Sequence, residues 1–129
     1  MSVLRVVHLP DFYFGGDAVV VVMDAAGLAV LIAALNQALA HGDCRIEHHP
    51  RTLEVQVQDG AADVGLDDAH VRWRIPHATV ADMIAKLSAM NGVTSGHHYV
   101  DIATPARTLV LSVGEYLDAP WLNDPLGHP

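Results

Sequence analysis

Two similar heptapeptides constrain the fold of this chain more than any other feature. Residues 51–57 read RTLEVQV and residues 107–113 read RTLVLSV, so both begin with Arg-Thr-Leu and end with Val at a spacing of 56 residues. The similarity has two explanations: a duplicated unit, or two strands that resemble one another by chance. A duplication requires that the neighbouring elements also recur in the same order.

An amphipathic helix pattern precedes each heptapeptide. Large apolar residues recur with the i, i+3, i+4, i+7 spacing of one helix face in segments 27–42 and 79–92. At a shift of 52 residues, four positions of one stripe match four of the other, namely Leu28, Leu31, Ile32 and Leu35 with Val80, Met83, Ile84 and Leu87. Asp24 stands before the first helix, where aspartate is a favoured N-cap. The helices therefore favour a duplication.

Strand patterns surround the two helices in the same order. One strand-like run leads into each helix and two follow it, the heptapeptide being the last. Residues 17–58 and 69–114 are thus predicted to form two βαββ units. The Gly- and Asp-rich segment 58–69 joins them as a solvated loop, and an additional strand is expected at 3–8.

The alignment of the heptapeptides also sets expectations for the strands before them. At a shift of 56 residues, His41 falls on His97 and Ile46 falls on Ile102. The helices match at a shift of 52 and the heptapeptides at 56. Four extra residues are therefore expected between the second helix and its first strand.

The predicted units lead to one fold class. Neither unit could bury the apolar face of its strands alone, so the two must share a core. With 51% apolar and 17% charged residues, the composition is typical of globular chains. We expect a single domain over residues 1–129 of the α+β class. It would be a two-layer sandwich with a mainly antiparallel sheet, two helices on one face, and the extra N-terminal strand.

Charge and composition exclude several kinds of partner. The formal net charge is −8, and there is one lysine against six scattered arginines. Nucleic acids and anionic membrane surfaces are recognised by clustered cations, so neither is an expected partner. A single cysteine, Cys44, excludes a disulfide framework within the chain and favours a cytoplasmic location. The excess of arginine over lysine indicates a bacterial source.

Nine histidines offer the only candidate metal ligands of note. The candidate zinc ligands are His48, His97 and His98, with Asp101 or Glu47 as acidic partner, because zinc takes three or four N, S or O ligands. Neighbouring residues of a strand point to opposite faces, so adjacent histidines do not chelate one ion. The expectation is therefore no cofactor, with zinc as the alternative, and no residue is assigned a catalytic role.

The tail, residues 115–129, combines proline with large apolar side chains. Prolines at 120, 125 and 129 interrupt regular structure, yet the segment is richer in apolar residues than disordered tails are. Four of its residues are candidate partner-binding anchors: Tyr116, Trp121, Leu122 and Leu126. The tail docks either on its own domain or on another molecule, which includes a second copy in a homodimer.

No motif in the sequence identifies a reaction. The hypothesis that fits best is a small acidic protein-binding domain without catalysis, regulatory or similar to immunity proteins, whose acidic surface can mask a basic target. The alternative is a histidine-lined site for a small ligand, or a metal-dependent enzyme site, between the two repeats. Convergence of the histidines in one pocket would favour the alternative.

Overall fold

The computed structural model describes residues 3–13, 16–48, 51–67, 69–103, 106–119 and 122. Within these ranges the chain forms two helices and eight strands. Their order is β1 (Leu4–Tyr13), β2 (Gly16–Met23), α1 (Ala25–His41), β3 (Asp43–His48), β4 (Arg51–Val57), β5 (Asp63–Leu66), β6 (His70–Ile75), α2 (His77–Ala89), β7 (Gly96–Asp101) and β8 (Thr108–Val113). The predicted α+β class is confirmed.

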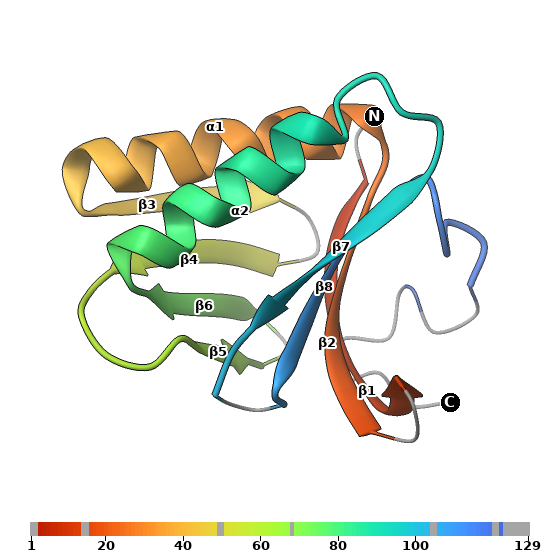
Figure 1. Cartoon of the computed structure of the whole chain (residues 1–129), viewed down its shortest axis with the longest axis horizontal. Helices are drawn as coiled ribbons and strands as arrows, with labels where there is room; N and C mark the ends of the chain where they lie inside the picture. Colours follow the sequence, from red (N-terminus) through yellow and green to blue (C-terminus); the bar gives the residue numbers. More distant parts are fainter. Residues whose placement is uncertain are drawn as a thin grey trace.

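The strands form two four-stranded sheets. Sheet A has the order β1-β2-β8-β7 and sheet B has the order β3-β4-β6-β5 (Figure 1). In each sheet the two central strands are parallel and each edge strand is antiparallel to its neighbour. Each sheet therefore consists of two hairpins joined side by side.

The two repeat units exchange hairpins. The first unit, β1-β2-α1-β3-β4, gives its first hairpin to sheet A and its second to sheet B, and the second unit does the reverse. The parallel ladders show the symmetry in their register, because Leu53 pairs with Val71 and Leu109 pairs with Val19. Leu53 matches Leu109 at a shift of 56 and Val19 matches Val71 at a shift of 52. The two junctions are thus equivalent.

The strand arrangement differs from the expected one in two respects. The strands divide into two sheets instead of forming one, because each parallel ladder joins a hairpin of one unit to a hairpin of the other. The segment expected to be a solvated loop contains strand β5, which pairs with β6. The N-terminal strand β1 is the counterpart of β5, so each unit has the order ββαββ.

The register also corrects the alignment of the strands after the helices. Ile46 lies opposite Leu53, and Val100 lies opposite the equivalent Leu109, so Val100 and not Ile102 corresponds to Ile46. His41 ends α1, whereas His97 lies within β7, so these two histidines are not equivalent. The four extra residues of the second unit are divided, two before β7 and two in the turn between β7 and β8.

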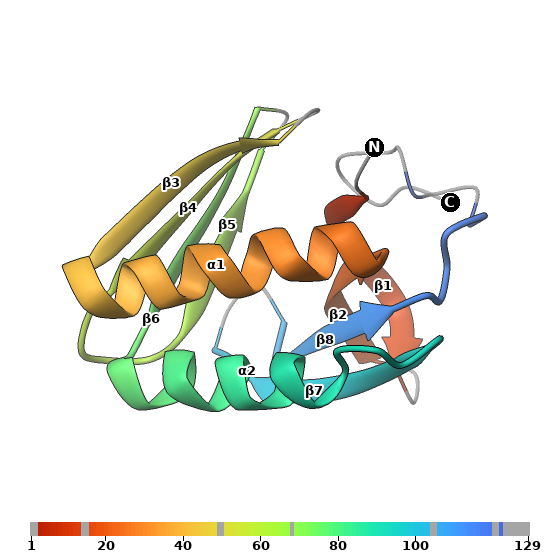
Figure 2. The ribbon, with the colours of Figure 1, turned by 90° about the horizontal axis from the view of Figure 1, so that it is seen from above.

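Both helices pack on the inner faces of the two sheets. Figure 2 shows α1 and α2 side by side, each extending from sheet B towards sheet A. The predicted apolar stripes face the core: Leu28, Leu31, Leu35, Val80, Met83 and Leu87 are buried, while Ile32 and Ile84 pack at its margin. One continuous apolar core therefore joins both helices to both sheets.

The two helices begin differently. The carboxylate of Asp24 accepts hydrogen bonds from the backbone amides of Gly27 at 2.7 Å and Val3 at 2.9 Å, so the predicted N-cap of α1 is confirmed. Pro76 occupies the equivalent position of α2 and provides no side-chain cap.

No helix formed by the described residues is long and apolar enough to cross a membrane.

Candidate functional site

The three candidate zinc ligands lie at three separate places. His97 is exposed on the outer face of sheet A, and its neighbour His98 points to the inner face, as strand alternation requires. His48 ends β3 in the other sheet, opposite Arg51. Within the described part of the chain, no three His, Cys, Asp or Glu side chains form a group that could hold a metal ion.

His97 belongs to a hydrogen-bonded cluster that links β7 to the segment after β8. Its Nδ1 donates to Oε1 of Glu115 at 3.0 Å, and the fully buried Ser112 donates its hydroxyl to the same oxygen at 2.9 Å. The ring of Tyr99 meets the His97 ring edge to face, with centroids 5.3 Å apart. The cluster holds the start of β7, the end of β8 and residue 115 together.

This cluster does not have the geometry of an activated nucleophile. Activation requires the histidine to accept the proton of the nucleophile, whereas here Ser112 and His97 both donate to the carboxylate of Glu115. The thiol of Cys44 is no better placed, because burial and the Asp43 charge raise its pKa and so disfavour the reactive thiolate. The cluster therefore holds β7 and the segment after β8 in a fixed arrangement, with the His97 side chain partly exposed.

Exposed apolar side chains gather around this cluster. The large hydrophobic residues that are exposed within the described ranges are Val93, Tyr99, Tyr116 and Leu117, between 36% and 45% exposed, and we call the last three of them the β7 patch. Tyr99 contacts His97, and residues 116 and 117 directly follow Glu115. The patch therefore lies along the outer face of β7 and the loop after β8, whereas Val93 contacts the inner side of Gly96 next to the buried Met90.

A close backbone contact joins these two loops. Gly114 has a φ of 73° and approaches the chain so closely that a Cβ atom there would lie 2.0 Å from the carbonyl oxygen of Thr94. Tyr116 has a φ of 61°, a left-handed conformation that is uncommon for a residue with a side chain. The loop that presents Tyr116 and Leu117 is thus held against the loop that presents Val93.

One of the tail anchors packs within the chain. Leu122 is half-buried against the apolar outer face of sheet A, where Val20 and Val110 are buried. This contact favours docking of the tail on its own domain. Tyr116 lies in the β7 patch, whereas the other two predicted anchors, Trp121 and Leu126, lie outside the described residues.

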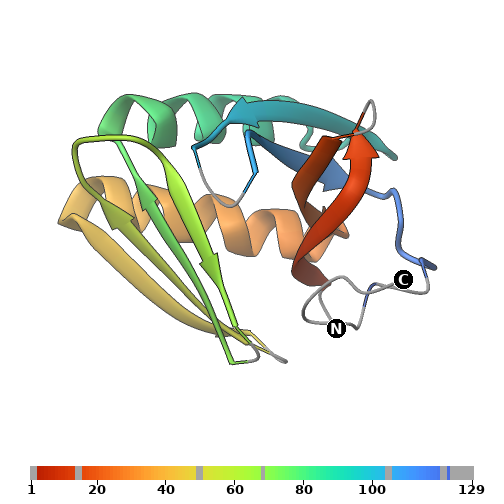
Figure 3. The ribbon, with the colours of Figure 1, turned by 90° about the horizontal axis from the view of Figure 1, so that it is seen from below.

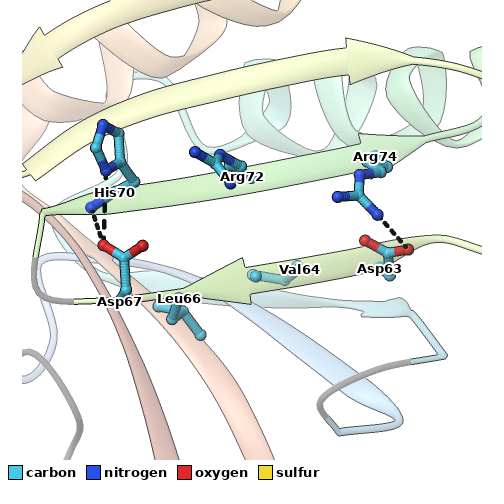
Figure 4. A pocket seen from close by; sticks show the side chains of 8 residues that line it. Asp63, Val64, Leu66, Asp67, His70, Arg72 and Arg74 are labelled. Atoms are coloured by element: carbon cyan, nitrogen blue, oxygen red, sulfur yellow. Dashed lines mark hydrogen bonds and ion pairs between the residues drawn. The ribbon is translucent and has the colours of Figure 1, made fainter.

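The outer face of sheet B is charged and open to solvent. Figure 3 shows the two sheets as separate layers, with the helices behind them. On the outer face of sheet B, Glu54 lies 3.8 Å from Arg45 and 3.5 Å from Arg72, and Asp63 lies 3.9 Å from Arg74. An open hollow of about 350 Å³ lies over β5 and β6 on this sheet, and Figure 4 shows the side chains that line it.

Sequence reasoning found part of these surfaces. The alternation of β6 places Arg72 and Arg74 on one face, as its pattern predicts. The contact of Glu115 with His97 carries no sequence signal, since it depends on the turn at Gly114.

No family model, curated protein or solved structure matches the chain.

Proposed function

We propose that this chain is a protein-binding domain without catalysis and that the β7 patch is its contact surface. The observation that carries the proposal is the placement of three exposed large apolar side chains, Tyr99, Tyr116 and Leu117, next to one fixed hydrogen-bonded cluster. Tyrosine is common among the side chains that dominate binding energy at protein interfaces. Two tyrosines, Tyr99 and Tyr116, are exposed in the patch.

The patch is preorganised for binding. The Glu115 carboxylate ties β7 to the loop after β8, and the close approach of Gly114 to Thr94 ties that loop to the loop before β7. A surface whose side chains are already positioned loses less entropy when a partner binds. The same contacts explain how an exposed loop can present Leu117 at a defined place.

The charges around the patch favour a basic partner. Glu115 adjoins the patch, and Asp101 and Asp118 are exposed beside it, in a chain whose formal net charge is −8. The nearby cation Lys86, which donates to the Tyr99 carbonyl oxygen at 2.7 Å, is paired with Asp82 at 2.9 Å. Carboxylates attract the ends of Lys and Arg side chains, and the faces of tyrosine rings add cation–π attraction. The expected partner is thus a protein that presents Lys or Arg next to an apolar side chain.

The test uses two substitutions in the patch and one matched control. Protein captured on the immobilised full chain from cells that make it is purified, and its Kd is measured by calorimetry for each variant. Because interface tyrosines contribute about 2 kcal/mol or more, Tyr99→Ser and Leu117→Ser are each expected to weaken binding by about tenfold or more. Arg45→Ser, on the exposed outer face of sheet B, is expected to leave the Kd unchanged.

Two results would overturn this proposal. One is a Kd that neither patch variant changes, and the other is a loss of binding caused by Arg45→Ser alone. The salt dependence adds a separate check, since attraction between an acidic patch and a basic partner must weaken as ionic strength rises. Binding that strengthens with salt would contradict the prediction that the partner is basic. The location of the contact surface is tested separately, by the patch variants.

A further inference from the structure

The hollow on sheet B is built around a glycine. Gly65 lies in the middle of β5, opposite Arg72 of β6, and an added Cβ there would meet only the Arg72 carbonyl oxygen, at 4.0 Å. Two ion pairs stand on either side of this glycine, Asp63 with Arg74 at 3.9 Å and Asp67 with His70 at 3.6 Å (Figure 4). The absent side chain therefore leaves an open space between two charged walls.

Arg72 is the cation that stands between these walls. Its closest carboxylate contact runs from Nε to Oε2 of Glu54 at 3.5 Å, longer than a charged hydrogen bond of about 2.7–2.9 Å. The guanidinium is about half exposed and makes no hydrogen bond with the residues that the structure describes. Figure 4 shows it between His70 and Arg74 on the strand that borders the hollow.

We propose that this hollow binds a ligand carrying a single carboxylate, held by the guanidinium of Arg72 above Gly65. A carboxylate matches the planar donor pair of arginine and can accept two parallel hydrogen bonds. The volume of about 350 Å³ falls within the range of small-ligand sites. This site is independent of the β7 patch, which lies on the other sheet.

The balanced charges that line the hollow do not favour more highly charged anions. Asp67 accepts hydrogen bonds from the backbone amides of Ala69 at 2.8 Å and His70 at 2.7 Å, so its carboxylate is held at the rim. Together with Asp63 it balances the charges of the two arginines that line the hollow, Arg72 and Arg74. The hollow therefore has no excess positive charge with which to hold a dianion, whereas the single charge of a monocarboxylate can be matched by Arg72 alone. The site is thus expected to prefer carboxylate to phosphate.

Nuclear magnetic resonance of the ¹⁵N-labelled full chain tests the proposal. Acetate and inorganic phosphate are added separately at constant ionic strength and pH 8, where phosphate is mainly the dianion, and the signals of the Gly65 amide and the Arg72 side-chain Nε are followed. Acetate is expected to shift both signals in a saturable manner, with an affinity at least about fivefold higher than that of phosphate. Shifts that rise linearly with acetate, or equal affinities for the two anions, would overturn the proposal.

Three variants assign the binding to the hollow. Arg72→Gln removes the guanidinium, and Gly65→Val fills the space above β5, so each is expected to weaken acetate binding by about tenfold or more. Arg45→Gln removes a cation from the same sheet face outside the hollow and is expected to have no effect. An equal loss in all three variants means general charge attraction and also overturns the proposal.

A further pair of probes distinguishes the two sources of such a carboxylate. N-acetyl-dialanine is titrated with a free C-terminus and with an amidated one. Tighter binding of the free peptide than of acetate indicates the C-terminus of a protein, and weaker binding indicates a small free carboxylate. Equal binding of the amidated peptide shows that the carboxylate is not recognised and rejects the site.

Discussion

The outer faces of the two sheets occupy equivalent positions of the repeat and carry opposite chemistry. In sheet A the part of the outer face formed by β1, β2 and β8 is largely apolar and buried, whereas in sheet B the outer face is charged and largely open to solvent. The register pairs them directly, matching Val20, Val22, Val110 and Val7 with Arg72, Arg74, Glu54 and Gly65. Backbone equivalence has therefore been kept while the surface chemistry has diverged.

The inner faces show what the repeat has to preserve. Leu53 and Leu109 are buried at equivalent positions, as are Val71 and Val19. These residues pack against the helices in the one shared core, so a polar residue at any of them would be buried without a partner. The inner faces are alike because the shared core requires apolar residues at equivalent positions of both units. The outer faces differ because one is largely buried and the other is exposed to solvent.

The largest effect is expected from exchanging residues across the two outer faces. Val20→Arg places a charge at a position that is 0% exposed, and the residue paired with it is Val110, where sheet B has Glu54. An unpaired buried charge costs several kcal/mol, so we expect a loss of about 4 kcal/mol or more, enough to unfold the chain. Circular dichroism and urea unfolding measure this loss directly.

The reciprocal exchange is the control. Arg72→Val puts the sheet A residue on the exposed face of sheet B, where valine has a high strand propensity, and the expected change in unfolding free energy is within about 0.5 kcal/mol. If both exchanges cost the same, the two outer faces do not differ in burial and the comparison fails.

A smaller effect is expected at the helix starts, which also differ between the units. Asp24→Ala removes the carboxylate that accepts from Val3 and Gly27, and should cost about 1–2 kcal/mol at pH 7. Desolvation alone would raise the pKa of Asp24, but the two backbone hydrogen bonds outweigh it and lower the pKa below its ordinary value. The stabilisation is thus present above pH about 4 and lost as pH falls through the lowered pKa.

Urea unfolding at pH 7 and near pH 3 measures this dependence. The equivalent position of α2 provides the control, because Pro76 has no titrating group and no side-chain cap. The stability difference caused by Pro76→Ala should therefore be the same at both pH values. A difference for Asp24→Ala that does not shrink in acid would show that the cap does not act through its charge.

The elements of this fold were largely predictable, but their assembly was not. The stripes that begin at Leu28 and Val80 identify the helices because a helix face has a clear period. Strand β5 has no such signal, since its four residues include Gly65 and follow a turn-rich segment. The division into two sheets depends on the long-range pairs of Leu53 with Val71 and Leu109 with Val19, and strand alternation is the same in one sheet or two.

The same limit applies to the candidate surfaces. Alternation within β7 correctly separates His97 from His98. The contact of His97 with Glu115 instead requires the chain to turn at Gly114, and the hollow requires the register that sets Gly65 against Arg72. The residue types in the sequence identify which side chains could form a site. Whether those side chains lie close together depends on the turns and on the register of the strands.

An effect smaller than that at the helix start is expected at Glu54, whose counterpart in sheet A is Val110. Glu54→Val removes two long ion contacts, 3.8 Å to Arg45 and 3.5 Å to Arg72, and both arginines are more than half exposed. Water can solvate them once Glu54 is gone, so we expect a change within about 1 kcal/mol that is insensitive to salt. Urea unfolding at low and high ionic strength measures it. A loss above about 2 kcal/mol would mean that sheet B needs its charges in order to fold, as sheet A needs its valines. A small change leaves those charges free to act on a ligand.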